Sequence, residues 1–486
     1  MAKDWKEKLN KIFHFESFRP GQREVLELLF ENKSVLGLMP TGSGKSLTYQ
    51  FFAETLNKGG ERAELVLVVT PLIALMEDQS QKARSFGLEA GFIHSQIPAS
   101  EKEKRLQRLK AGFYTLFFAT PERLQKPEFQ EALSQRTLRL FVVDEAHCIS
   151  LWGHDFRPDY AKLGEFRKKW KEPLTLALTA TATPDVQKEI LKSLSIQNSQ
   201  IVSTGLKRDN IGIQVHEVYG LEEKMEDMIP RLRERTGTAL IYTTLIKTAE
   251  EIRRFLHKQG LESLIYHGDL PPQKRRSSLK KFMMEEKSLM VATPAFGLGI
   301  DKANIRNVFH LEPPGSLESY FQEVGRAGRD GLPSQAILYY DSEDLTIPMQ
   351  FIQSAHPEKS YIEKMYHLIE SHPDKIKSLG AEYLAEQMSF KNRGDHRVES
   401  ALNILERWGC ITRNQEVIEL AGALDPEMFT LENQQQLLKH HNQKLYTFLQ
   451  WIKNTEECRL LGIYRYFGHE GETPCGLCDV CVPPKG

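Results

Sequence analysis

Short apolar runs alternate with amphipathic segments along roughly the first 340 residues of the chain. Each run is brief and rich in β-branched residues, so it is typical of a β-strand. We expect strands at 34–39, 65–69, 114–119, 138–143 and 174–178, and then at 239–243, 263–267, 289–293, 307–311 and 336–340. Continuous apolar strands between helices predict parallel sheets covered on both faces. The polar stretch near 205–235 interrupts the series, which predicts two α/β domains in tandem.

Beyond about residue 345 the strand signal fades and helical patterns take over. We expect helices at 361–371, 380–388 and 396–409, a possible β-hairpin at 410–420, and one more helix over 445–468. Three helices and a hairpin fit a winged-helix-like module. A plain helical spacer fits the same pattern equally well.

Composition narrows the class of protein. Hydrophobic residues make up 40% and charged residues 27% of the 486 positions, which is typical of a globular chain. No apolar run reaches the roughly 18–20 residues of a membrane span, and the polar start does not resemble a secretory signal, so we expect a cytoplasmic protein without membrane contact. The net charge of −1 means that any nucleic-acid surface must be local. The basic candidates are 167–171 and 274–276.

A phosphate-binding loop is indicated by MPTGSGKS at 39–46, between the first expected strand and a helical pattern. Glycines allow the backbone to turn tightly and to direct N–H groups at phosphate oxygens. In this pattern Lys45 reaches the β- and γ-phosphates and Ser46 offers a hydroxyl to Mg²⁺. Met39 stands where the general motif has its first glycine. The alternative is a glycine turn before a helix.

Two acids end the strand at 138–143, in VVDEAH. Asp144 suits Mg²⁺, which prefers carboxylate and water oxygens, and Glu145 could orient and deprotonate a water molecule. A simple turn is the alternative for the pair alone. The preceding TGSGKS makes the catalytic interpretation the better one.

The second α/β series contains SYFQEVGRAGRDG at 319–331. Arg326 and Arg329 are three residues apart, so they share a helical face or a loop edge. Phosphoryl transfer spreads negative charge over oxygens that a guanidinium group can stabilise. We therefore predict that both arginines complete the nucleotide site when the two domains close. A structural salt bridge is the alternative, above all for Arg326.

Planar side chains crowd the loop directly after the two acids. CISLWGHDFRP carries Trp152, His154, Phe156 and Arg157. Aromatic rings can stack on DNA bases, at about 1–3 kcal/mol per base, and arginine can contact phosphate. Core packing is the alternative for the aromatics, but this stretch is too polar for a buried segment.

The six cysteines are unevenly distributed, and four of them gather near the end of the chain. These are Cys458, Cys475, Cys478 and Cys481. Four thiolates suit a closed tetrahedral zinc site, and they can also hold an iron–sulfur cluster. Cys148 and Cys410 stand apart, and we expect them to be buried free thiols.

Together these motifs resemble those of superfamily 2 helicases, and most closely those of the RecQ family. TPLIALMEDQ (70–79), DEAH and LTATA (178–182) match the first-domain motifs in order, and 291–306 and 322–331 match the second-domain motifs. FHFESFRPGQ (13–22) resembles the adenine-reading segment, and CISLWGHDFRP resembles a DNA-contacting loop distinctive of this family. The resemblance implies an ATP site made of Phe15, Arg19, Gln22, Thr41, Gly42, Ser43, Gly44, Lys45, Ser46, Gly297 and Asp301.

The resemblance also favours structural zinc over iron–sulfur. The tail departs from the family pattern, since about 110 residues separate Asp344 from Cys458 and the chain ends soon after Cys481. This arrangement resembles the short RecQ-like helicases of Bacillus-type bacteria. We therefore expect RecA-like domains at 1–205 and 206–344, a helical or winged-helix-like region at 345–430, and a zinc-binding subdomain at 431–486.

The resemblance implies an ATP- and Mg²⁺-dependent 3′–5′ DNA helicase of repair, recombination or replication. Asp144, Glu145, Lys45, Arg326 and Arg329 would be its catalytic residues. We expect a monomer that binds single-stranded and forked DNA near the nucleoid, with single-stranded-DNA-binding protein or other repair proteins as partners. Two alternatives are an RNA-directed or duplex-DNA translocase with the same motor, and a DNA-binding module with a degenerate motor.

Overall fold

A computed structural model describes most of the chain: residues 2–40, 42–56, 63–150, 157–206, 208–297, 300, 302–388, 397–414, 417–425, 431–469 and 473–482. These residues form two compact units. The first unit runs as far as Glu312 and also takes in Glu318–Tyr339 and the end of the chain from Thr455. The second unit consists of Pro313–Leu317 and Tyr340–Asn454.

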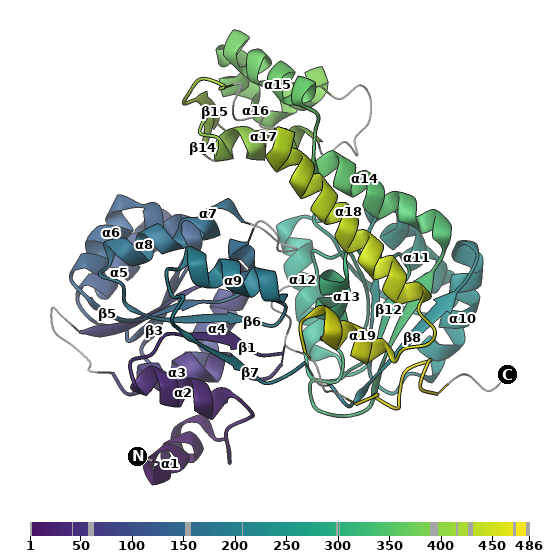
Figure 1. Cartoon of the computed structure of the whole chain (residues 1–486), viewed down its shortest axis with the longest axis horizontal. Coiled ribbons are helices and arrows are strands. Elements are labelled where there is room, and N and C mark those ends of the chain that lie inside the picture. The colour runs from purple at the N-terminus through teal and green to yellow at the C-terminus, as the bar shows by residue number, and fades with distance from the viewer. Residues whose placement is uncertain are drawn as a thin grey trace. The chain divides into compact units, whose positions relative to one another are not determined.

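The first sheet of the larger unit has the strand order β3-β4-β2-β5-β6-β1-β7, and its paired strands run parallel (Figure 1). Two hydrophobic clusters cover its two faces, as expected for apolar strands between helices. Its strands are β1 Val35–Leu38, β2 Glu64–Val69, β3 Ala90–Ile93, β4 Leu116–Ala119, β5 Thr137–Val143, β6 Leu174–Thr179 and β7 Gln200–Ser203.

The helices of this part are α1 Ala2–Phe13, α2 Gln22–Phe30, α3 Ser46–Glu54, α4 Ile73–Ser85, α5 Ala99–Lys110, α6 Pro127–Ser134, α7 Pro158–Ala161, α8 Leu163–Lys169 and α9 Pro184–Ser193. Short 3₁₀ turns occur at Pro121–Gln125 and Ala146–Ile149.

The second sheet has the order β10-β11-β9-β12-β13-β8, with β8 at one edge. Its strands are β8 Ile211–Glu217, β9 Thr238–Tyr242, β10 Leu264–Tyr266, β11 Leu289–Ala292, β12 Ile305–His310 and β13 Ser334–Tyr340. Its helices are α10 Gly220–Glu234, α11 Ile246–Lys258, α12 Pro272–Met284 and α13 Leu317–Val324. The expectation of two RecA-like parallel-sheet domains is thus confirmed.

Three strands escaped the sequence analysis, and all three lie at sheet edges: β3 and β7 in the first sheet and β8 in the second. Edge strands are exposed along one side and need less continuous apolar sequence than central strands. In β8, for example, buried and half-buried positions alternate along IGIQ, and VHE has no buried position. The polar stretch near 205–235 therefore contains strand β8 and helix α10.

The end of the chain packs on the second sheet. A single helix over 445–468 was expected, and this prediction is wrong: α18 Leu431–Lys453 ends, and α19 Arg459–Tyr466 begins separately after Cys458. Asp479 binds strand β8 from the loop beyond, since its N–H donates to Ile213 O at 3.1 Å. Arg459, which is only 3% exposed, grips the Asp479 carboxylate with Nε and Nη2 at 3.0 and 2.8 Å.

The second unit contains a 3₁₀ turn (Ser342–Leu345), helices α14 Thr346–Ala355, α15 Lys359–Ser371, α16 Pro373–Met388, α17 Arg397–Arg407 and α18, and the antiparallel strands β14 Ile411–Asn414 and β15 Val417–Leu420. Three helices and a hairpin are present as expected. They share a buried core that includes Ile362, Leu384 and Leu405, which argues against a plain helical spacer. Among the described residues, no helix is long and apolar enough to cross a membrane.

Candidate nucleotide site and cysteine cluster

The loop after β1 has the backbone geometry of a phosphate cradle. Gly42 and Gly44 adopt φ of +84° and +81°, where a side chain would be strained. A Cβ on Gly44 would lie 2.6 Å from Gln22 Nε2, so this glycine also allows a close approach. Met39 is fully buried in the core, which explains why the position of the motif's first glycine can hold a large apolar residue.

Arg19 and Gln22 fasten this loop from the preceding segment. Gln22 Nε2 donates to Ser43 O at 3.1 Å and to Gly44 O at 2.9 Å, while its Oε1 accepts from Arg19 N at 2.8 Å. The Arg19 guanidinium donates to Gly42 O. Both side chains therefore act on the loop backbone directly, in addition to any contact with a base. Ser43 Oγ is buried without a hydrogen-bond partner among the described residues, as expected of a group that awaits a ligand.

The acids at the end of β5 lie at the floor of this site. Burial, reinforced by the nearby Glu145 carboxylate, raises the pKa of Asp144 to about 6, whereas Lys45 acts in the opposite direction. Glu145 has a left-handed backbone, with φ 48° and ψ 47°, which is uncommon for a residue with a side chain. Strain of this kind is concentrated at functional sites, where the surrounding structure maintains it.

His147 connects these acids to the next strand of the sheet. Its Nδ1 lies 2.9 Å from Thr179 Oγ1 at the end of β6 and 3.4 Å from a carboxylate oxygen of Glu145. The Thr179 hydroxyl also accepts from Thr181 N at 3.2 Å. His147 therefore contacts both Glu145 and the segment 178–182.

Arg326 and Arg329 follow α13, and Arg329 contacts the loop after β1. A Cβ on Gly42 would lie 3.2 Å from Arg329 Cγ, and Arg329 Nη1 donates to Ile300 O. Arg326 is 3% exposed, and its Nε has no hydrogen-bond partner among the described residues. Arg326 lies beside Tyr242. Burial raises the pKa of Tyr242 overall, and the Arg326 guanidinium opposes part of this rise. Arg329 thus lies beside the loop after β1, Arg326 lies beside Gly297 and Tyr242, and both arginines line the same cavity.

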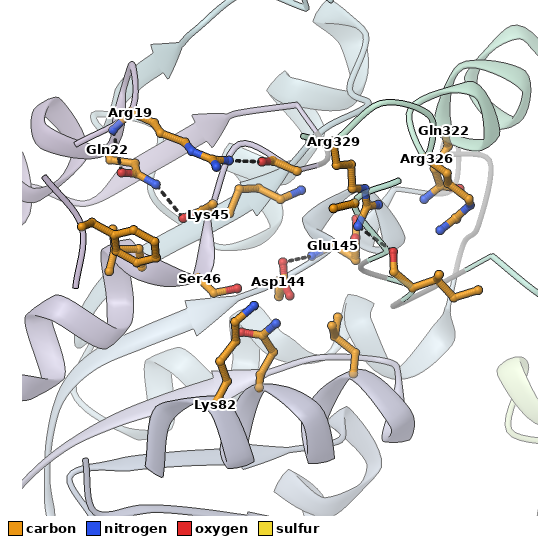
Figure 2. Close-up of a pocket in the computed structure, with 18 of the residues that line it drawn as sticks. Arg19, Gln22, Lys45, Ser46, Lys82, Asp144, Glu145, Gln322, Arg326 and Arg329 are labelled. Atoms are coloured by element: carbon orange, nitrogen blue, oxygen red, sulfur yellow. Dashed lines mark hydrogen bonds between the residues drawn. The ribbon is translucent and has the colours of Figure 1, made fainter. Parts of the chain in front are cut away.

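These groups line one cavity of about 390 Å³ within the larger unit (Figure 2). The predicted residues that line it are Phe15, Arg19, Gln22, Gly42, Gly44, Lys45, Ser46, Asp144, Glu145, Gly297, Arg326 and Arg329. Ser43 lies in the same loop but does not line the cavity. Thr41 and Asp301 lie outside the described residues.

Four polar residues of the cavity were not predicted: Ser17, Gln79, Lys82 and Gln322. Gln79 and Gln322 belong to the quoted motifs 70–79 and 322–331, so the motifs themselves contained the signal. Lys82 lies one helical turn beyond Gln79 on α4, and Figure 2 shows its side chain directed toward Ser46 and Asp144. The i, i+3 spacing from Gln79 was the available signal for Lys82.

The aromatic stretch is represented in the structure only by its flanks, because Trp152, His154 and Phe156 lie outside the described residues. Arg157 N donates to Cys148 O at 3.0 Å, and Arg157 Nη1 lies 3.4 Å from Pro71 O in the motif 70–79. Tyr160 Oη donates to Asp144 O at 3.0 Å. The far flank of this stretch is therefore bonded to the backbone of the acid that we expect to hold Mg²⁺.

The two basic candidates differ. Arg167 is buried, and it donates to Thr175 Oγ1 at 2.8 Å, so the segment 167–171 is partly structural. The segment 274–276 lies on α12 with Lys274 and Arg276 exposed. Of the two, the α12 segment is the better candidate for contact with nucleic acid.

The cysteine cluster has the dimensions of a tetrahedral metal site. The four sulfur atoms, from Cys458, Cys475, Cys478 and Cys481, lie within 4.8 Å of one another. Two of the separations are 3.9 and 4.0 Å, close to the roughly 3.8 Å edge expected for metal–sulfur bonds of about 2.3 Å. Cys148 and Cys410 are both buried, as predicted. The residues therefore fit a structural zinc ion.

Comparison with protein families gives three matches. The DEAD/DEAH box helicase family matches residues 19–190, and the helicase conserved C-terminal domain matches 221–331. The RecQ zinc-binding family matches 411–482, which includes all four clustered cysteines.

Individual relatives extend this result. The ATP-dependent DNA helicase RecQ of Bacillus subtilis is 41% identical over 354 residues, covering 72% of this chain and 58% of the relative. The probable ATP-dependent DNA helicase RecS of the same organism is 37% identical, covering 71% and 68%. RecQ of Haemophilus influenzae is 30% identical over 98% of this chain and 63% of its own length. The chain thus spans less than two thirds of both RecQ relatives.

Solved structures support the fold alone, because their sequence identity is low. Dbp5 of S. cerevisiae bound to RNA and ADP BeF3 gives a TM-score of 0.60 at 19% identity, covering 71% of this chain and 90% of that structure. The Mycobacterium smegmatis helicase Lhr bound to ssDNA and AMP-PNP gives 0.57 at 19% identity, covering 90% and 61%.

Proposed function

The chain belongs to the RecQ family of DNA helicases, and on that premise we propose that it is an ATP-dependent DNA helicase that moves 3′ to 5′ along single-stranded DNA. The observation that carries the proposal is the shared cavity. Phosphate-loop residues and two acids from the first sheet line it together with two arginines from the second. A site built in this way ties hydrolysis to the relative position of the two sheets, as a translocating motor requires.

In the proposed mechanism the first-sheet residues bind ATP and prepare the attacking water. Lys45 binds the β- and γ-phosphates, and Phe15, which is 43% exposed at the cavity, stacks on the adenine. Gln22, assisted by Arg19, hydrogen-bonds the edge of the base. Because the Gln22 amide also holds Ser43 O and Gly44 O, base recognition and the shape of the phosphate loop are coupled.

Glu145 is the proposed general base, and the two arginines are the proposed stabilisers of the transition state. Arg326 and Arg329 would neutralise charge that develops on the γ-phosphoryl oxygens, as guanidinium groups do in related phosphoryl transfers. Ser46 and Asp144 have the donor atoms that Mg²⁺ prefers, and the ion when bound neutralises phosphate charge. Thr41 and Asp301 are retained as proposed nucleotide contacts by resemblance.

DNA binding is assigned to Trp152, His154, Phe156 and Arg157 by family resemblance. The bonds of Arg157 and Tyr160 to the segment around Asp144 support a role for this stretch in signalling strand engagement to the hydrolytic site. The four cysteines would hold zinc, which supplies rigidity to the end of the chain rather than hydrolytic chemistry.

The finer assignments complete the proposal. The domain limits are those predicted from the sequence, namely 1–205, 206–344, 345–430 and 431–486. The substrates are single-stranded and forked DNA in repair, recombination or replication, at the nucleoid in the cytoplasm. The protein acts as a monomer, with single-stranded-DNA-binding protein or other repair proteins as partners.

Strand displacement tests the proposal most completely. Forked, 3′-tailed and 5′-tailed duplexes are incubated with the protein, ATP and Mg²⁺, with Lys45→Ala as the inactive control. We expect release of strands from the forked and 3′-tailed duplexes only. Displacement of the 5′-tailed duplex alone would contradict the polarity, and preferential displacement of RNA duplexes would favour the RNA-directed motor.

A further inference from the structure

A second polar pocket lies at the other end of the first sheet. It has a volume of about 270 Å³ and is lined by Arg84, Leu88, Glu89, Ala90, Glu101, Arg105, Arg108, Phe113 and Tyr114. Leu88 and Glu89 precede β3, and Phe113 and Tyr114 precede β4, so the pocket lies at the amino ends of these strands. The phosphate loop and the two acids follow the carboxyl ends of β1 and β5 in the same parallel sheet. The two sites therefore lie at opposite ends of the strands of this sheet.

Backbone carbonyls of the edge strand hold two of the arginines. Strand β3 lies at the end of the strand order, beside β4, so among the described residues one of its sides has no neighbouring strand. Arg84 Nε donates to Ala90 O at 2.8 Å, and Arg105 Nη1 donates to Phe92 O at 3.0 Å. Each guanidinium group uses one nitrogen for this purpose and has other N–H groups left for a ligand.

Aromatic rings stack on the guanidinium groups of Arg105 and of the third arginine, Arg108. The Arg105 guanidinium lies 4.1 Å from the centre of the Phe92 ring, and that of Arg108 lies 3.7 Å from the Phe113 ring. Stacking holds a guanidinium plane while its in-plane N–H groups stay available to oxygen acceptors. Phe113 is 43% exposed and offers an apolar contact at the rim.

The charge in the pocket is only partly balanced. Arg105 is paired with Glu101 at 2.8 Å, but among the described residues no carboxylate lies within ion-pair distance of Arg84 or Arg108. All three guanidinium groups act on the Tyr114 side chain. Burial raises the pKa of Tyr114, whereas Arg108, Arg105 and Arg84 each lower it. Glu89 also lines the pocket, which leaves an excess of one positive charge among the three arginines and two glutamates.

We propose that this pocket docks an acidic peptide segment of a partner protein. Guanidinium forks match carboxylates in bidentate geometry, and the exposed Phe113 ring favours a peptide that carries an apolar side chain beside its acids. The three cations converge on one cavity instead of forming a row along the surface, as a contact that follows a DNA backbone would require. Because the pocket and the nucleotide site lie at opposite ends of the strands, a partner can stay bound in the pocket while ATP is hydrolysed.

Fluorescence anisotropy with a labelled ten-residue peptide of glycine, four aspartates and one phenylalanine tests the proposal. The matched control peptide has asparagine in place of each aspartate. We compare the wild type with Arg84→Ala/Arg108→Ala and with the charge-matched control Arg253→Ala/Arg254→Ala, whose positions are exposed on α11. Melting temperatures establish that both variants are folded.

We expect the pocket variant to bind the acidic peptide roughly tenfold more weakly, because two charge-assisted contacts are lost. The control variant should bind as the wild type does, the asparagine peptide should bind weakly to all three proteins, and DNA-stimulated ATP hydrolysis should be unchanged. If both variants bind the acidic peptide equally weakly, the effect comes from overall charge and the proposal is wrong. A parallel loss of single-stranded DNA affinity in the pocket variant would assign the pocket to nucleic acid. No binding of the acidic peptide to the wild type would also overturn the proposal.

Discussion

The nucleotide cavity and the cysteine cluster are built in opposite ways. The cavity gathers side chains from positions as distant as Phe15 and Arg329, carried by two separate sheets, and it stays open. The cluster draws its four sulfur atoms from the short span Cys458–Cys481 and closes them around one point. A site that must bind, react and release depends on long-range geometry, whereas a structural site needs only local chain. Loss of a cavity residue should therefore act on turnover, and loss of a cluster residue should act mainly on stability.

The largest effect on turnover is expected from Lys45→Ala. Removal of the cation that we expect to bind the β- and γ-phosphates should reduce kcat of DNA-stimulated ATP hydrolysis by about 10³-fold, because Lys45 is the cation that the phosphate loop itself supplies. Steady-state hydrolysis measures this. The control Lys33→Ala removes an exposed lysine paired with Glu31 and should leave kcat unchanged. Comparable kcat values for wild type and Lys45→Ala would exclude the cavity as the hydrolytic site.

Arg326→Ala comes next. It should lower kcat by about 10²–10³-fold with little change in nucleotide affinity, since the guanidinium group acts on charge that develops during the reaction. Single-turnover hydrolysis and titration with a fluorescent nucleotide separate the two quantities. If affinity falls while kcat is preserved, Arg326 is a binding residue and does not stabilise the transition state.

Gln22→Ala should have a moderate effect that appears in KM. The variant loses the bonds to Ser43 O and Gly44 O, so the phosphate loop is less well ordered before ATP binds. We expect KM for ATP to rise about tenfold and kcat to fall less. A matched series with GTP sharpens the test: a Gln22 that reads the base loses discrimination between ATP and GTP, whereas a purely structural Gln22 keeps it.

Cys478→Ser should have the smallest effect on turnover and a clear effect on stability. The metal loop is bound to β8 through Asp479, so loss of zinc should lower Tm by about 5 °C or more while kcat changes less than about tenfold. Zinc content and thermal unfolding are the measurements, with Cys410→Ser as the control that keeps zinc. A large fall in kcat with little change in Tm would show that the cluster takes part in ATP hydrolysis. The packing of Phe467 on Phe321 of α13 would then connect the two.

Sequence patterns revealed the chemistry of both regions better than their architecture. The phosphate loop, the acids and the four cysteines could be identified from the sequence, because each motif is short and its residue types follow from ligand chemistry. Strands β3, β7 and β8 were missed because edge strands need little continuous apolar sequence. The break between α18 and α19 was missed because helical periodicity continues through the turn that places Cys458.

Other features arise only from tertiary structure. The left-handed backbone of Glu145 and the contact of Arg329 with the loop at Gly42 depend on residues far apart in the chain. Lys82 was not predicted to line the cavity, because its i, i+3 spacing from Gln79 is equally compatible with a solvated helix face. Long-range packing, not local propensity, fixes such positions.

The most direct test of the central claim is ATP hydrolysis by the wild-type protein without polynucleotide and with single-stranded DNA, duplex DNA or RNA. The two-sheet cavity, together with the proposed DNA-contacting stretch whose flank is bonded to Asp144 O through Tyr160, predicts strong stimulation by single-stranded DNA and much weaker stimulation by the other two. Hydrolysis that no polynucleotide stimulates, or that RNA stimulates most, would contradict the account.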